Sequence, residues 1–190
     1  PGISQEIRTI VEDKNGELWL GAFENQIINI RFPDDNRLDG AVLKRYVVPL
    51  KGEFKEIHAF HAAGHLMFAS PEGIFRFNKK NEPVPDFTFG KQYAGGGLGV
   101  FRIVEGNNGH CWFHSEKRNI EAVPQPDGTY RLRKKPFTRI PRTQVNAIYQ
   151  DPFRPALWFA CNTGLIRFDT SMQKDYGAPF FTLIREVLIN

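Results

Sequence analysis

The residues best suited to bind a ligand lie in a short charged turn in the second half of the chain. Residues 115–119 are Ser-Glu-Lys-Arg-Asn, whereas comparable turns elsewhere in the sequence are short and mostly neutral. A lysine next to an arginine can hold a carboxylate or a sulfate, and arginine can do so through two parallel hydrogen bonds. We therefore predict that Lys117 and Arg118 belong to a polar, ligand-facing patch with Arg139 and Arg142. The alternative is that they occupy the hydrated tip of a hairpin.

Further polar residues lie in comparable turns or connections and are candidates for ligand binding. They are Glu24, Asn25, Glu72, Tyr93, Glu116 and Asn162. The recurring carboxylates would suit glycoside cleavage, but that reaction needs two carboxyl groups at a set distance, one of them with a raised pKa. The sequence contains neither a nucleophile elbow nor a metalloprotease motif. We therefore predict a non-catalytic protein, with a glycan-active enzyme as an alternative.

The densest basic run of the chain follows soon after the charged turn. Its members are Arg131, Arg133, Lys134, Lys135, Arg139 and Arg142. The run could protect an exposed edge strand, or it could bind a polyanion. A nucleic-acid site would need interleaved aromatic residues and a recognisable motif, and no such motif accompanies Tyr130 and Phe137. The net charge of +4 is modest, and we predict no nucleic-acid partner.

No group of residues predicts a metal site or a cofactor. His58, His61 and His65 are expected on a strand and its turn, where residues three apart point to opposite faces. The glycine-rich residues 95–99 lack the Lys-Ser/Thr ending and the helix of a phosphate-binding loop, so they are expected to form a flexible connector. Cys111 occupies a position held by leucine in related segments, which predicts a small buried side chain.

All of these residues belong to a sequence unit that occurs four times. Its copies are IRTIVEDKNGELWLG (7–21), FKEIHAFHAAGHLMFA (54–69), VFRIVEGNNGHCWFH (100–114) and VNAIYQDPFRPALWFA (145–160). A large residue follows each turn, at spacings of 48, 45 and 46 residues, at Trp19, Met67, Trp112 and Trp158. A branched residue precedes each turn, at Ile10, Ile57, Ile103 and Ile148. A period near 45 residues predicts stacked units that bury their apolar faces against one another, with these four large residues filling the seams between neighbouring sheets.

Each unit has the pattern of short antiparallel strands. In the first unit, strands are expected at 7–12, 18–22, 27–32 and about 42–48, and the Asn-Gly pair between the first two favours a tight hairpin. The fourth strands of the next two units are expected at about 86–89 and 129–133. We therefore predict an all-β fold, a β-propeller of about four four-stranded blades. By propeller convention, the loops that carry the candidate residues would crowd one face.

The sequence resembles the two-component regulator propeller repeat. The resemblance is clearest at 7–21 and at 145–169, where the last copy closes with GLIRFD. The middle copies are degenerate, and Met67 replaces the usual tryptophan. Residues 180–190 (FFTLIREVLIN) look like the opening strand of the triple-tyrosine, immunoglobulin-like module that follows such propellers.

This resemblance implies the periplasmic sensor region of a bacterial hybrid histidine kinase or a related membrane regulator. Its ligand would be a small molecule or an oligosaccharide, and the signal would leave through the C-terminal end. The kinase motifs themselves are absent from this sequence, and contact with a membrane would involve only flanking segments. A protein–protein interaction scaffold is the alternative function.

The expected blade boundaries follow the repeat. Blades are predicted at 1–50, 51–95, 96–141 and 142–175, the last being incomplete, and 176–190 is predicted to be an outer strand of blade 4 or the start of the immunoglobulin-like module. The sensor propellers that the chain resembles generally have more than four blades. The sequence therefore leaves open a four-bladed ring, an open arc of a longer propeller and an assembly between chains. An uncovered sheet edge would favour a homodimer.

Overall fold

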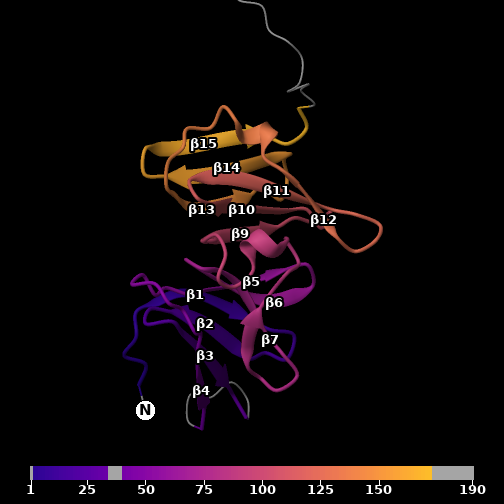
Figure 1. Ribbon diagram of the computed structural model, residues 1–190. Helices are drawn as coiled ribbons and strands as arrows, with labels where there is room; N and C mark the ends of the chain where they lie inside the picture. The colour runs from indigo at the N-terminus through magenta and orange to yellow at the C-terminus, as the bar shows by residue number, and fades with distance from the viewer. Residues whose placement is uncertain (1, 34–39, 173–190) are drawn as a thin grey trace, which may run out of the picture.

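The strands of the protein form four antiparallel sheets that follow one another along the chain. The computed structural model describes residues 2–33 and 40–172. In each sheet the strands are hydrogen-bonded to their neighbours in sequence order, so every sheet is a simple meander. Figure 1 shows the sheets succeeding one another from the N-terminal to the C-terminal part of the chain. These four sheets are the blades of a β-propeller, which confirms the predicted fold class.

The first two blades have four strands each. Blade 1 consists of β1 (Ile7–Glu12), β2 (Leu18–Ala22), β3 (Gln26–Arg31) and β4 (Val42–Val47). Blade 2 consists of β5 (His58–Ala62), β6 (His65–Ser70), β7 (Gly73–Phe77) and β8 (Pro83–Pro85). The prediction of a fourth strand at 86–89 is wrong. Asp86 instead starts a turn there, because its carboxylate accepts a hydrogen bond from the Thr88 backbone N–H at 2.8 Å.

Blade 3 has four strands, and blade 4 has three in the described part of the chain. Blade 3 consists of β9 (Arg102–Glu105), β10 (Cys111–Ser115), β11 (Arg118–Pro124) and β12 (Tyr130–Arg133). Blade 4 consists of β13 (Val145–Gln150), β14 (Ala156–Cys161) and β15 (Gly164–Asp169). Two short 3₁₀ turns, η1 (Lys91–Tyr93) and η2 (Lys135–Phe137), lie in the connections between blades. The strand predicted at 176–190 lies outside the described residues.

Strand register corrects one of the two repeat anchors. Ile10, Ile103 and Ile148 pair with Leu20, Phe113 and Phe159 on the second strands of their blades. In blade 2 the residue paired with the equivalent Phe68 is Ala59, and Ile57 lies just before β5. Ile57 is fully buried all the same. Ile57 therefore packs in the core between blades 1 and 2, and Ala59 occupies the strand position that isoleucine holds in the other three blades.

The hydrophobic core is divided into three clusters, and each fills a seam between consecutive blades. Trp19 packs in the seam between blades 1 and 2, Met67 in the seam between blades 2 and 3, and Trp112 in the seam between blades 3 and 4. These three large residues therefore have the predicted seam role. The same prediction is wrong for Trp158 in the described residues, because Trp158 is in none of the clusters and is only half-buried. Its face of blade 4 has no following blade in the described residues.

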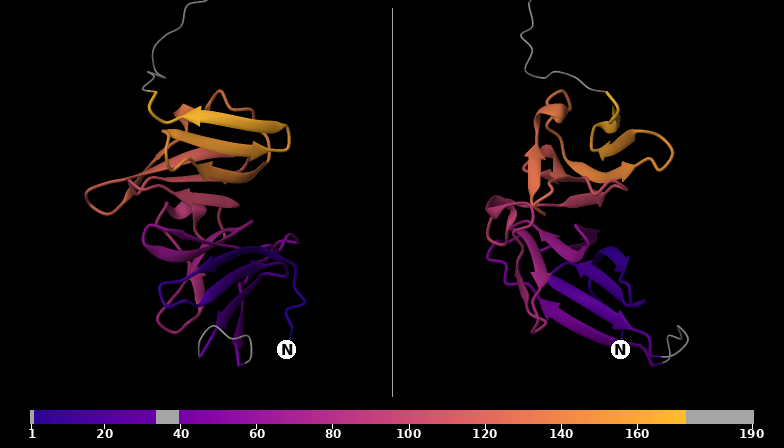
Figure 2. Two further views of the ribbon diagram at one scale, coloured as in Figure 1. Left: turned by 180° about the vertical axis from the view of Figure 1, so that it is seen from behind. Right: turned by 90° about the vertical axis from the view of Figure 1, so that its right-hand side faces the viewer.

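The blades form an open arc. Inner strand β1 lies beside β5, β5 beside β9, and β9 beside β13. Blades 1 and 4 lie at opposite ends of the molecule in all three views, so the described residues do not close a ring (Figures 1 and 2). The structure therefore excludes a closed four-bladed ring in the described residues, and assembly between chains stays a prediction.

Candidate functional site

The turns between second and third strands meet the connections between blades on one face of the arc. The backbone N–H of Asn25 donates to the Lys55 carbonyl at 2.9 Å, and the N–H of Gly96 donates to the Glu72 carbonyl at 2.7 Å. In blade 4 the N–H of Asn162 donates to the Gln144 carbonyl at 3.2 Å. The structure thus brings together the two kinds of loop that carry the candidate residues.

Two adjoining hollows lie on this face, around the turn between β10 and β11 and the connections on either side of blade 3. The first hollow, of about 190 Å³, is lined by Lys117, Arg118, Asn119, Lys134, Lys135, Phe137, Thr138, Ile140, Pro141 and Arg142. The second hollow, of about 320 Å³, is lined by Tyr93, Leu98, Ser115, Glu116, Lys117, Arg118, Ile120, Lys134 and Arg142. Four cations, Lys117, Arg118, Lys134 and Arg142, line both. We call the two hollows together the cationic site.

The turn between β10 and β11 presents two of these cations. Ser115 and Arg118 pair across the hairpin, and the two residues between them have left-handed backbones, with φ of 49° at Glu116 and 57° at Lys117. Such a two-residue turn matches the twist of the strands, but it favours Asn-Gly, and each non-glycine residue costs about 1 kcal/mol there. Glu24 and Asn25 form the same left-handed pair in blade 1. Blades 1 and 3 therefore share this turn geometry, whereas the positive charge is specific to blade 3.

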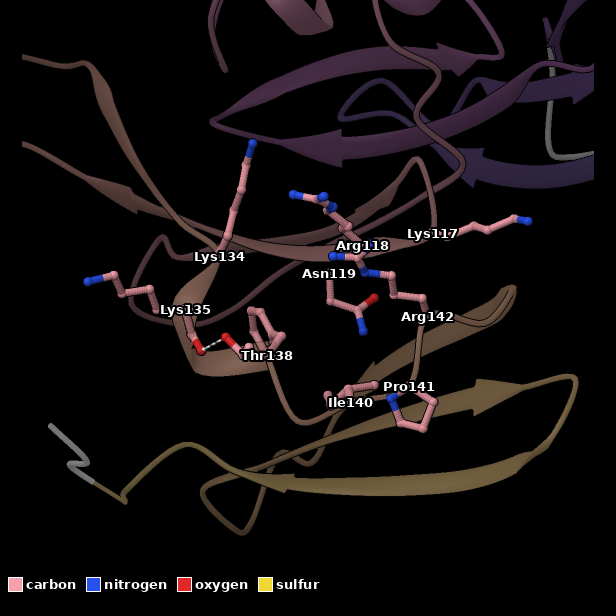
Figure 3. A pocket seen from close by; sticks show the side chains of 10 residues that line it. Lys117, Arg118, Asn119, Lys134, Lys135, Thr138, Ile140, Pro141 and Arg142 are labelled. Carbon is pink, nitrogen blue, oxygen red and sulfur yellow. Dashed lines mark hydrogen bonds between the residues drawn. The ribbon is translucent and has the colours of Figure 1, made fainter. Parts of the chain in front are cut away.

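The connection from β12 to β13 supplies the other cations. Phe137 of η2 is 5% exposed, and its ring lies 5.7 Å from that of Phe159 and 4.9 Å from that of Phe168. This packing fixes the connection against blade 4. In Figure 3 the side chains of Arg118 and Arg142 lie close together in the middle of the site, Lys117 and Lys134 extend on either side, and Lys135 points away.

The positive charge of the cationic site is not neutralised within the described part of the protein. Lys117, Arg118, Lys134, Lys135 and Arg142 form no ion pair with any described residue. Glu116 is the single acidic residue that lines either hollow in the described residues. Like charges held close together raise the local potential and attract anions. The site is therefore electrostatically suited to a ligand with more than one negative charge.

Buried polar groups accompany the cations. Ser115 is 2% exposed, and its hydroxyl has no hydrogen-bond partner among the described residues. Asn119 is 7% exposed, and its Oδ1 lies 2.9 Å from Nδ1 of His114. Tyr93 is 1% exposed, and burial raises the pKa of its hydroxyl although nearby Arg118 opposes the shift. Its phenol therefore keeps its proton at neutral pH.

Several of the predicted residues have structural partners instead. The Asn25 amide donates to the Val48 carbonyl at 2.6 Å, and the Glu72 carboxylate accepts from the backbone N–H groups of Lys51 and Gly52 at 2.6 and 2.5 Å. Asn162 accepts a hydrogen bond from the Asn146 amide at 2.8 Å. Glu24 is exposed in the blade 1 turn and lines neither hollow of the cationic site. These four residues hold or form turns, and the structure does not bring them to the cationic site.

Arg139 lies away from the predicted patch. It lines a separate hollow of about 770 Å³ along β15, which also involves Pro141, Leu165 and Met172. The structure therefore unites Lys117, Arg118 and Arg142 of the predicted patch with Tyr93 and Glu116, but not with Arg139. Ser115, Asn119, Lys134 and Lys135 were not among the predicted binding residues. The basic run pointed to the two lysines, while nothing in the sequence pointed to an unpartnered serine.

The basic run is split between two environments. Arg131 and Arg133 lie on β12, the outer strand of blade 3, and Arg133 pairs with Glu121 at 3.3 Å. Lys134, Lys135 and Arg142 turn into the cationic site. Arg131 and Arg133 therefore have positions suited to protecting the edge strand, whereas Lys134, Lys135 and Arg142 have positions suited to binding an anion.

The histidines have separate surroundings. His58 is buried between Arg102, whose Nη1 lies 2.8 Å from its Nδ1, and Glu56, whose Oε1 lies 3.4 Å from its Nε2. His61, three residues away, is exposed. In residues 2–33 and 40–172 no three histidine, cysteine, aspartate or glutamate side chains are placed to hold a metal ion. Cys111 is fully buried as predicted, and burial raises the pKa of its thiol to about 12.

Residues 95–99 are not the flexible connector that the sequence predicted. A Cβ on Gly97 would lie 2.5 Å from the Gln92 carbonyl oxygen, and one on Gly99 would lie 2.7 Å from that of Pro71. The N–H groups of Gly96 and Gly97 both donate to the Glu72 carbonyl. The glycines allow close backbone packing, which positions Leu98 at the second hollow.

Comparison with known proteins supports the propeller assignment. Residues 1–24 match the family model described as two component regulator propeller, as the sequence resemblance predicted. No curated protein matches the sequence significantly. The predicted triple-tyrosine module lies outside the described residues.

Several solved structures share the fold at low sequence identity. The extracellular domain of BT4673 from B. thetaiotaomicron, described as a one-component system, superposes with a TM-score of 0.56 at 14% identity, covering 97% of this chain and 28% of that one. An inactive variant of virginiamycin B lyase from Staphylococcus aureus, crystallised with quinupristin, gives 0.53 at 19% identity, covering 87% and 56%. PorZ, a surface component of the type-IX secretion system of Porphyromonas gingivalis, gives 0.53 at 17%, covering 87% and 26%. The chain thus spans little more than half of the lyase.

Within residues 2–33 and 40–172, no helix has the length and apolar character needed to cross a bilayer.

Proposed function

We propose that this chain is a non-catalytic, periplasmic ligand-sensing propeller of a two-component signalling protein, and that it binds an oligosaccharide or another polar ligand at the cationic site. The observation that carries the proposal is a set of five cations that line two adjoining hollows and form no ion pair with any described residue. The match of residues 1–24 to the regulator propeller family and the shared fold of the BT4673 extracellular domain support the signalling context.

The position of the site suggests how binding would act on the blades. Tyr93 and Leu98 come from the connection between blades 2 and 3, Lys117 from blade 3, and Arg142 from the connection between blades 3 and 4. A ligand that touches all three would stabilise the blade arrangement in which they converge. It would transmit a signal only if it bound another arrangement less tightly.

A thermal-shift screen with poly- and oligosaccharides tests the proposal. A ligand that binds only the native state raises its midpoint of unfolding. We expect at least one saccharide to raise the midpoint of the full chain, and the double variant Lys117→Ala/Arg118→Ala to lose this shift. The variant Lys79→Ala/Lys80→Ala removes the same charge from an exposed turn of blade 2 and should keep the shift. A panel in which no saccharide changes the midpoint would overturn the proposal.

The same panel separates binding from catalysis. The cationic site offers a single carboxylate, Glu116, in the described residues, whereas glycoside hydrolysis ordinarily needs two. We therefore expect no cleavage products from any saccharide that stabilises the protein. Product release that Lys117→Ala/Arg118→Ala abolishes would favour a glycan-active enzyme instead.

A protein-interaction scaffold is a second candidate, and the end of blade 4 favours it. No strand of the described chain pairs with the outer edge of β15, and Leu165 on this strand is 67% exposed. Free strand edges can pair with another chain, which would give a homodimer or a complex with a different protein. Light scattering over a range of protein concentrations distinguishes this role. The measured mass of a scaffold would rise with protein concentration, and no saccharide would raise its midpoint of unfolding.

A further inference from the structure

We propose that the cationic site takes an oligosaccharide with two neighbouring acidic groups, sulfate or carboxylate, one in each hollow. This inference rests on the proposed function and names the chemistry of its ligand. The two hollows adjoin and share Arg118 and Arg142. Two anions in adjacent positions would thus be held partly by the same cations.

The first argument is that the polar side chains of the first hollow offer almost only hydrogen-bond donors, since the Glu116 carboxylate lines the second hollow alone. Lysine and arginine have no acceptor, and Asn119 has its amide oxygen occupied by His114. Burial lowers the pKa of His114, so its ring is neutral and donates one N–H to that oxygen. The Asn119 amide nitrogen is then the group left for a ligand in the first hollow. Sulfate and carboxylate only accept hydrogen bonds, whereas a neutral sugar hydroxyl also needs acceptors.

The second argument is the unpartnered hydroxyl of Ser115 in the second hollow. A buried hydroxyl without a partner is unfavourable, and such groups are rare in native proteins. Ser115 lines the hollow beside Lys117 and Arg118. An oxyanion held by these two cations would be the acceptor that the hydroxyl lacks among the described residues. Each hollow therefore has its own neutral donor, Asn119 in the first and Ser115 in the second.

The walls of the site favour a sugar over a nucleic acid. Base recognition uses exposed aromatic rings as stacking platforms. The two aromatic residues that line the hollows, Tyr93 and Phe137, are 1% and 5% exposed and packed into the core. Leu98 and Pro141 instead offer small apolar surfaces on either side of the cations. Such surfaces suit the C–H face of a sugar ring between two acidic groups.

Isothermal titration of the full chain with matched disaccharides tests the two-anion requirement. The probes are one disaccharide as its unsulfated, monosulfated and disulfated forms, and a short single-stranded oligonucleotide of equal charge. We expect the disulfated form to bind about tenfold or more tightly than the monosulfated form, and the neutral form not to bind. Affinity should fall as salt is raised from about 50 mM to about 200 mM, because ions screen charges on this length scale.

Variants assign the two acidic groups to the two hollows. Ser115→Ala should weaken binding of the disulfated probe about tenfold and leave that of the monosulfated probe less affected. The same variant should keep or raise the midpoint of unfolding, because it removes a buried hydroxyl without a partner. A merely structural serine would not show this combination. Lys79→Ala/Lys80→Ala should bind all probes as the unmodified chain does.

The outcomes separate this inference from the function on which it rests. Equal binding of the mono- and disulfated probes would overturn the two-anion inference and leave a ligand-sensing site. If the unsulfated disaccharide bound as tightly as the sulfated forms, the inference that the ligand is an anion would be overturned as well. If the oligonucleotide bound more tightly than the disulfated disaccharide, the ligand would be a nucleic acid and not a sugar. Binding of none of the probes, together with a saccharide screen without any thermal shift, would overturn both proposals.

Discussion

Trp112 and Trp158 occupy the same position of the repeat but have different surroundings. Trp112 is 4% exposed and lies in the seam between blades 3 and 4, whereas Trp158 is half-buried at the open end of blade 4. Trp158 pairs across the sheet with Tyr149, which is 57% exposed. The repeat therefore determines the face to which a side chain points. Its burial depends on whether another blade follows.

The seam and the open end also differ in what they can do. The seam between blades 3 and 4 anchors Phe137, and through it the connection that carries Lys134 and Arg142. The open end exposes Tyr149, Leu165 and Met172 to solvent. Ligand recognition would thus depend on the seam, while association with another chain would depend on the open end. Three experiments test this division, and a further one tests the buried polar network around His58.

The largest effect is expected from the two tryptophans. Trp112→Ala should lower the free energy of unfolding by about 3–5 kcal/mol, because it leaves a cavity in a packed seam. Trp158→Ala should cost about 1 kcal/mol, because no described blade packs against that face. Urea denaturation of both variants measures the difference. Equal losses would show that the face of blade 4 is covered in solution.

Two phenylalanines separate stability from binding. Phe137→Ala should cost about 3 kcal/mol and also weaken binding at the cationic site, because the ring anchors the connection that presents Lys134 and Arg142. Phe153 is 93% exposed in the turn between β13 and β14, and Phe153→Ala should change stability by less than about 0.5 kcal/mol. Urea denaturation and calorimetric titration of both variants provide the readouts. Full affinity in folded Phe137→Ala would exclude the anchoring role.

The pH dependence of stability tests the buried polar network between the blades. Burial and the charges of Arg102 and Arg8 lower the pKa of His58, and Glu56 only partly opposes them. The unfolded chain therefore takes up a proton at His58 near pH 6.5, whereas the native state takes it up only at lower pH. The contribution of neutral His58 to the free energy of unfolding is thus fully present above pH 6.5 and is lost as pH falls. Glu56, whose pKa is lowered chiefly by its hydrogen bond with His58, adds a loss at more acidic pH.

Variants isolate the part due to His58. His58→Gln should flatten the fall in stability below pH 6.5. Some pH dependence should persist, since burial also lowers the pKa of His114. Urea midpoints between pH 5 and pH 8 measure the profile. A profile that His58→Gln leaves unaltered would place the titrating group elsewhere.

The smallest effect on stability is expected at the free edge of β15. Leu165→Lys should change the free energy of unfolding by less than about 0.5 kcal/mol, because the side chain is already 67% exposed. If the chain forms dimers through this edge, the added charge should shift them toward monomers. Sedimentation or light scattering provides the readout, with Lys79→Ala/Lys80→Ala as a control. Dimers that resist Leu165→Lys would point to a different interface.

Part of the site could be predicted from the sequence because its signals are local. The turn at Lys117 and Arg118 carries more charge than the other turns of the repeat, and the sequence alone shows this difference. Asn25 and Glu72 illustrate the limit. Both lie in the turns of the predicted face, but they hold backbone groups of the neighbouring connection. A hydrogen bond across 20 or more residues leaves no mark in the sequence pattern.

By itself, the sequence determined the all-β propeller units, the turn chemistry and the seam positions of Trp19, Met67 and Trp112. These features follow from the spacing of apolar residues and from local backbone preferences, which neighbouring residues set. Only the tertiary structure decided that Arg118 and Arg142 converge while Arg139 does not, and that Trp158 stays half-buried. Convergence and burial depend on how separate blades pack, and that packing is set by contacts between residues far apart in the chain.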